Sequence, residues 1–178
     1  MTMKQAVVLG LAMLALGACE RKADNDDGAA IALAQPIDYS PEEKATLLAA
    51  MPAPFNAADL ADGEKQFAKC RSCHTITAEK MNLTGPHLYG VFGRKAGSEP
   101  GYPFTDAMKN HGVVWDFVTL DAYLEAPQVV VKGTKMALAG GGIDDANKRR
   151  NLIAYLKIET TPRPEPAPAA SENRSASE

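Results

Sequence analysis

The chain has few thiols and imidazoles, because only three cysteines and three histidines occur among its 178 residues. Positive charge is not in excess either, since the formal net charge is −3. Bulk charge therefore gives no reason to expect nucleic acid as a partner. Beyond the first 19 residues the sequence lacks an apolar run of about 20 residues, which a membrane-spanning helix would need. These absences favour one globular domain with tails.

Strand patterns and internal repeats are also missing, so the chain is predicted to be all-α. Helices are predicted where a capping residue precedes apolar residues at helical spacing. The expected N-caps within the domain are Asp59, Thr105, Thr119 and either Asp144 or Asp145. The first of these helices is expected to continue as far as Cys70. A domain of about 100 residues built from short helices and long loops has a thin core, so something besides aliphatic burial is expected to organise it.

The first segment, residues 1–18, has the features of a bacterial lipoprotein signal peptide. A single Lys4 precedes an apolar stretch that ends at Leu16 and is too short to span a membrane comfortably. The run L-G-A-C ending at Cys19 resembles a lipobox, whose cysteine is lipidated and becomes the new N-terminus. Cys19 is therefore the predicted lipidation site, and its acyl chains would anchor the protein to a membrane on the periplasmic side of a bacterial cell envelope. The alternative is an ordinary secretory peptide in which this cysteine has no role.

Composition divides the rest of the chain into three parts. Residues 19–55 are predicted to be a charged, alanine-rich tether. A short helix is expected within it, because Ser40 and Glu43 have the spacing of a capping box. Residues 160–178 have the proline and small-polar bias of an extended, disordered tail. The folded domain is therefore predicted at residues 56–159.

The motif that indicates chemistry is K-C-R-S-C-H, which contains Cys70, Cys73 and His74. A zinc site would need about two more cysteine or histidine ligands at suitable spacing, and no second pair occurs. A redox pair of the thioredoxin kind should follow a strand, whereas this pair follows a predicted amphipathic helix. The pattern C-x-x-C-H is typical of c-type haem attachment. On a helical turn the three side chains share one face, so two thioether bonds and an imidazole can meet one porphyrin.

Further motifs follow in order along the chain. They are GEKQFAKCRSCHT, TGPHLYGVFGRKAG, PGYPFTDAMKNHGVVW, YLEAPQ, GTKMALAG and NLIAYLK. With them, the chain from Asp59 to Lys157 resembles class I cytochrome c of the mitochondrial and related bacterial type. The resemblance implies an all-α class I cytochrome c fold, in which short helices and long loops surround one covalently bound haem c.

The resemblance also assigns iron ligands. It implies that His74 is one axial ligand and that Met136, in GTKM, is the other. Met81 and Met108 lack the surrounding motif, and a buried core position is the ordinary role of a methionine. A histidine–methionine pair raises the reduction potential and leaves the iron no open position for substrate. We therefore expect an electron carrier and not an enzyme.

Other roles implied by the resemblance concern residues around the ligands. Pro86 would offer its carbonyl to the ring N–H of the histidine ligand. Tyr123 would approach the methionine sulfur, and Arg94 and Trp115 would be partners of a haem propionate. All four are expected to contact the cofactor.

The sequence departs from the family pattern at several positions. Phe104 and Met108 replace residues that hydrogen-bond in the haem pocket, and Lys132 stands where a proline usually precedes GTKM. The loop that holds Met136 is therefore expected to be loose, with ligation that is lost readily at high pH. An apolar docking patch is expected over Val129, Val130, Val131 and Leu138.

The expected function is that of a monomeric, membrane-tethered single-electron carrier between respiratory or photosynthetic redox complexes. The candidate partners are a quinol-oxidising cytochrome complex, a terminal oxidase and a photosynthetic reaction centre. One alternative is a tethered redox subunit bound permanently to an oxidase or dehydrogenase. Another is a haem peroxidase, which would require the loss of Met136 from the iron.

Overall fold

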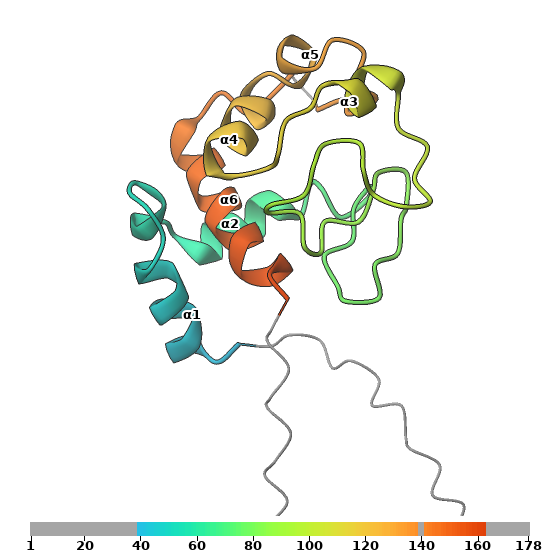
Figure 1. Ribbon diagram of the computed structural model, residues 1–178. Coiled ribbons are helices and arrows are strands. Elements are labelled where there is room, and N and C mark those ends of the chain that lie inside the picture. The colour runs from blue at the N-terminus through green and yellow to red at the C-terminus, as the bar shows by residue number, and fades with distance from the viewer. Residues whose placement is uncertain (1–38, 139–140, 163–178) are drawn as a thin grey trace, which may run out of the picture. The chain divides into compact units, whose positions relative to one another are not determined.

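The computed structural model describes residues 39–138 and 141–162, and within them the fold is helical, without strands (Figure 1). The elements are α1 (Pro41–Ala49), the 3-10 helix η1 (Phe55–Ala57), α2 (Leu60–Phe67), α3 (Asp106–Asn110), α4 (Phe117–Glu125), α5 (Pro127–Val130) and α6 (Ala146–Thr160). This confirms the all-α fold class. The predictions for residues 1–18, for Cys19 and for most of the tail lie outside the described residues.

Most helices begin where capping residues predicted them. Ser40 accepts a hydrogen bond from the backbone of Glu43, whose carboxylate accepts one in return, so the predicted capping box of α1 is present. Asp59 caps α2 and Thr105 caps α3. At the last helix the cap is Asp145, which resolves the two alternatives left by the sequence.

The predicted start of α4 was wrong. Its N-cap is Asp116 and not Thr119. The Asp116 carboxylate accepts from the backbone N–H of Thr119 at 2.8 Å, and the threonine hydroxyl accepts from the backbone N–H of Asp116 at 2.8 Å. Each side chain therefore accepts from the backbone N–H of the other residue, which is the pattern of a capping box, and Thr119 lies inside the helix.

The packing of α2 against α6 forms the centre of the fold (Figure 1). A side chain at Gly63 would place its Cβ 2.7 Å from the Cβ of Tyr155 and 2.9 Å from the carbonyl carbon of Asn151. Only glycine allows the two helices to approach this closely. Asn151 also links the helices through its side chain, which accepts from the Asp59 N–H at 3.0 Å and donates to Asp62 at 2.9 Å.

The packed core begins earlier in the chain than residue 56. Met51 and Phe55 are both buried, and the Phe55 ring lies 4.7 Å from that of Phe117. The helix α1 contacts α6, where Lys44 forms a 2.8 Å ion pair with Glu159. Part of the segment predicted as tether is therefore part of the domain.

Long loops occupy the side of the domain away from α1. The chain between α2 and α3 is irregular (Figure 1), and its Lys95 forms an isolated bridge with Val114, which follows α3. Of the helices in residues 39–138 and 141–162, none combines the length and apolar character needed to span a bilayer. These loops form one side of the cavity described next.

Candidate functional site

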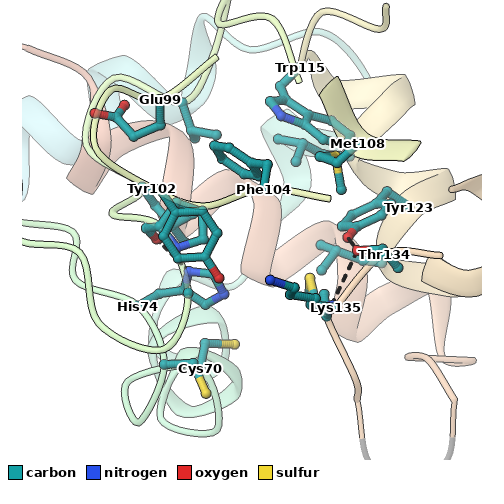
Figure 2. A pocket seen from close by; sticks show the side chains of 18 of the residues that line it. Cys70, His74, Glu99, Tyr102, Phe104, Met108, Trp115, Tyr123, Thr134 and Lys135 are labelled. Atoms are coloured by element: carbon teal, nitrogen blue, oxygen red, sulfur yellow. Dashed lines mark hydrogen bonds between the residues drawn. The ribbon is translucent and has the colours of Figure 1, made fainter. Parts of the chain in front are cut away.

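A cavity of about 360 Å³ lies between the loop after α2 and the segment around α4 and α5. Its volume is within the range of cavities that hold small molecules and cofactors. Every predicted cofactor-contacting residue lines it: Cys70, Cys73, His74, Pro86, Arg94, Trp115, Tyr123 and Met136. Figure 2 shows Cys70 and His74 across the cavity from Tyr123 and Thr134. The fold therefore brings together residues that are up to 66 positions apart in the sequence.

The C-x-x-C-H motif forms a separate turn after α2. The helix ends at Phe67, earlier than the sequence predicted. Backbone N–H groups of Cys73 and His74 then donate to the Cys70 carbonyl at 3.0 and 2.9 Å. Burial, and to a lesser degree the neighbouring Cys73, raises the pKa of the Cys70 thiol. Both cysteines are free thiols that face the cavity.

The imidazole of His74 is held in one tautomer. Its Nδ1 lies 2.6 Å from the Pro86 carbonyl oxygen. A carbonyl can only accept, so Nδ1 carries the proton and Nε2 has a free lone pair. Burial lowers the pKa of His74, and the bond to the carbonyl opposes that shift. The predicted contact between Pro86 and His74 is present, and it leaves Nε2 as a neutral ligand.

Gly85 leaves room for the imidazole ring of His74, because glycine has no side chain. A Cβ at this position would lie 2.8 Å from Nδ1 and 2.9 Å from Nε2 of His74, and closer still to Cε1. The backbone of Gly85 and Pro86 therefore packs directly on the ring and fixes its plane. The sequence reasoning missed this glycine, although it stands in the TGP motif.

The opposite wall is organised around Thr134. Its hydroxyl lies 2.7 Å from the Tyr123 hydroxyl and accepts from the backbone N–H of Met136 at 3.2 Å. Gln128 donates to the carbonyls of Thr134 and Met136 at 2.9 and 3.3 Å. Burial raises the pKa of Tyr123 against the opposing effect of its bond to Thr134. The phenol hydrogen-bonds to Thr134, two residues before Met136, and not to the methionine sulfur.

The chain is similar in sequence to a known family of proteins. The model of the family described as "Cytochrome c" matches residues 60–158, more than half of the chain. The chain belongs to the cytochrome c family. Cytochrome c of Cochliobolus lunatus is 44% identical over 107 residues, which are 60% of this chain and 97% of that protein. Cytochrome c2 of Rhodomicrobium vannielii is 43% identical over 105 residues, which are 59% of this chain and 82% of that one.

A solved structure supports the fold class. Cytochrome cH from Methylobacterium extorquens matches with a TM-score of 0.52 and 46% identity. The match covers 56% of this chain and 98% of that one. The described domain therefore has the class I cytochrome c fold.

The cytochrome c family carries one covalently bound haem c, and the cavity fits this group. One wall offers two thiols and a neutral imidazole nitrogen, and the other offers the thioether of Met136. The lining between them is mostly apolar. These are the donors that hold haem c. Cys70 and Cys73 would form the thioether bonds, and His74 and Met136 would bind the iron.

Around this cytochrome c pocket, the two predicted propionate partners have contacts of their own. Arg94 forms an ion pair with Glu99 and donates to the His87 carbonyl at 2.8 Å. Burial lowers the pKa of Arg94, and Glu99 opposes that shift. The Trp115 ring lies 5.0 Å from the ring of Tyr123. Both predicted residues line the cavity, and their contact with a propionate stays a prediction.

The family departures have different consequences. Phe104 packs edge-on against Tyr102, whose hydroxyl donates to the Thr84 carbonyl at 2.5 Å.

Val131 is only 1% exposed, so its predicted place in a surface docking patch was wrong. It lies at the end of α5, directed into the core, whereas Val129 is 82% exposed. Thr134, Gly85 and Glu99 are among the pocket residues that sequence reasoning missed.

Proposed function

We propose that this cytochrome c is a membrane-tethered single-electron carrier that works between respiratory or photosynthetic redox complexes in a bacterial envelope. One observation supports the carrier role above all: an imidazole and a thioether line one cavity. The thioether belongs to Met136, whose N–H donates to Thr134, and Figure 2 shows Thr134 across the cavity from His74. Haem bound between them supplies an iron that gains and loses one electron. With His74 and Met136 both bound to that iron, no position would be left for a substrate.

The residues of the chain prepare the cavity for electron transfer with little movement. The Pro86 carbonyl fixes the ring of His74 and increases the basicity of its Nε2. Thr134 and Gln128 fix the backbone on either side of Met136. The apolar lining excludes water and favours the state of lower charge, which raises the reduction potential. Ligands held in place in advance need little rearrangement when the charge changes.

The predicted lipidation of Cys19 supports the membrane tether. Its acyl chains would contribute about 0.8 kcal/mol per buried CH₂, so several chains give stable anchoring. The tether would join the domain at α1, which packs against α6. The anchor would then hold the cytochrome close to membrane complexes on the periplasmic side.

Fractionation of cells tests the tether. The wild-type protein and a Cys19→Ala variant would be produced with a labelled fatty acid, and haem staining would verify attachment in both. We expect the label and membrane association in the wild type alone. A wild-type protein without label that a salt wash releases from membranes would contradict the tether and leave the carrier role intact.

The partners can be identified by kinetics on isolated membranes. Residues 56–159 contain 13 basic and 12 acidic side chains, so the protein part of this domain is close to neutral. We expect the rate of electron transfer to a quinol-oxidising complex, terminal oxidase or reaction centre to depend weakly on salt. A rate that falls steeply with ionic strength would contradict this expectation.

A further inference from the structure

A second group of ionisable side chains lies behind one wall of the cavity, apart from the iron ligands. The His87 side chain is 2% exposed, Glu99 is 11% exposed and Arg94 is 16% exposed. Glu99 lies between the other two, with Oε1 2.7 Å from His87 Nε2 and Oε2 paired with the Arg94 guanidinium. Arg94 and Glu99 also line the cavity, and Figure 2 shows Glu99 at its edge.

His87 is the unsatisfied member of this group. Among the described residues, neither of its ring nitrogens has a hydrogen-bond partner. The contact between Nε2 and Glu99 is close but lacks the direction of a hydrogen bond. Buried polar atoms are nearly always paired, so an orphaned imidazole suggests a role. In contrast to the side chain, the backbone N–H of His87 has a partner, because it donates to the Asn82 side-chain oxygen at 2.9 Å.

The charges of the group leave room for one more proton. Arg94 stays protonated at any physiological pH, so it balances the Glu99 carboxylate. His87 then decides whether the group is neutral or carries one positive charge. The Glu99 carboxylate lies 2.7 Å from Nε2 and the ring is buried, so this imidazole is close to a negative charge and shielded from solvent. A change of charge nearby is therefore felt strongly at this ring.

We propose that His87 is a proton-binding site coupled to the haem, and that Glu99 is the positioning residue that sets its affinity. If haem iron bound in this cavity gained an electron, the net charge of the pocket would fall by one, and His87 would bind a proton from solvent as a new N–H bond. On oxidation the electron would pass to the acceptor and the His87 proton would return to water. Because the coupling is reciprocal, the reduction potential must fall as pH rises through the titration of His87. The proposal rests on the carrier function proposed above.

Other ionisable groups near His87 are accounted for. Among the described residues, Glu99 is the charged group that contacts its ring, and Arg94 donates to its backbone carbonyl. Tyr102 donates to the Thr84 carbonyl. Lys135, which lies in the loop that holds Met136, donates to the Pro103 carbonyl at a distance of 3.2 Å. The haem carboxylates are the remaining titratable groups, and the variants below separate their contribution from that of His87.

Redox titration between pH 5 and pH 9 tests the proposal on the haem-loaded protein, because this range spans the titration of histidine. In the wild type we expect the reduction potential to fall with rising pH over one pH interval and to stay constant on either side of it. His87→Asn should abolish that interval. Glu99→Gln should raise the potential at high pH and move the interval to lower pH, since it removes the charge that stabilises the imidazolium. Glu64→Gln is the matched control, because Glu64 pairs with an exposed Arg71, and it should change nothing.

NMR of the His87 ring in the wild type gives a second measurement that does not need a variant to fold. We expect a higher pKa for His87 in the reduced protein than in the oxidised protein. Equal values in the two states would overturn the proposal, as would an unchanged interval in His87→Asn, which would assign the protons to the haem carboxylates. A reversible one-electron wave without pH dependence would reject the coupling alone. Absence of any such wave would reject the carrier function as well.

Discussion

The two walls of the haem cavity hold their ligands in different ways. On the first wall, backbone atoms position His74: the Pro86 carbonyl is 2.6 Å from Nδ1, and the Gly85 backbone packs against the ring. On the second wall, side chains position Met136, through the hydroxyl of Thr134 and the amide of Gln128. A backbone contact is disturbed mainly by added bulk, whereas a side-chain contact can be deleted by a single substitution. Single substitutions should therefore alter the position of Met136 more readily than that of His74.

Added bulk on the histidine wall should have the largest effect. In Gly85→Ala, the new methyl group would overlap the ring of His74 and displace it from the Pro86 carbonyl. We expect a loss of stability of about 3 kcal/mol, the upper end of the range for overpacking, together with altered haem spectra. Denaturant unfolding and absorption spectra measure both effects.

The matched control for that substitution is Gly112→Ala. Gly112 has a φ of +82° and open space around it, so alanine should cost only about 1 kcal/mol of backbone strain. The haem spectra should not change. Equal effects of the two substitutions would show that contact with His74 is not what requires glycine at position 85.

Deleting the central contact of the methionine wall should have the next largest effect. Thr134→Val leaves the Tyr123 hydroxyl and the Met136 N–H without their partner. We expect a loss of about 2 kcal/mol and release of the methionine from iron at lower pH, followed by alkaline titration of the iron–sulfur absorption band. Tyr123→Phe should add little in the Thr134→Val background, because the shared bond is already gone. Full additivity would show that the two hydroxyls act independently.

Gln128→Ala should weaken the same wall by a smaller amount. Gln128 is an exposed residue that donates to two carbonyls of the ligand loop. The expected cost is about 1 kcal/mol, with a small shift in the alkaline transition. A shift as large as that of Thr134→Val would mean that the loop depends more on its outer contact than on its buried one.

A helix cap outside both walls should affect stability alone. Asp116→Ala removes the cap of α4, and the expected cost is about 1 kcal/mol without a change in the haem spectra. Hydrogen bonds from Thr119 lower the pKa of Asp116 in the folded protein. Its contribution is therefore present above the pKa of the unfolded chain and is lost as pH falls through the folded value. Thermal unfolding at neutral and acidic pH, compared with the wild type, checks this.

Local patterns were enough to predict some of this molecule. Cys70 and His74 lie within one turn, so their shared face follows from spacing alone. Met136 could be assigned only through the family resemblance, because the distance between the walls depends on how the whole chain folds. The caps Asp59 and Thr105 were predicted correctly, but Thr119 was not, since the sequence does not show which partner of a capping box comes first.

Contacts between distant segments account for what sequence reasoning missed. The burial of Phe55 depends on Phe117, 62 residues later, and no local pattern links them. Thr134 has ordinary neighbours in sequence, and its importance comes from meeting Tyr123. The predicted looseness of the methionine loop stays a prediction, although Thr134 and Gln128 supply four contacts that the sequence did not reveal.

The central claim is that His74 and Met136 bind the same iron from opposite walls. The absorption spectrum of the oxidised protein at neutral pH tests it most directly, because a methionine–iron bond gives a weak band at long wavelength. We predict this band in the wild type and its loss in Met136→Leu. The band should persist in the control variant Met81→Leu, because Met81 is exposed and lies outside the cavity. A wild-type protein without the band, or a band that persists in Met136→Leu, would contradict the account.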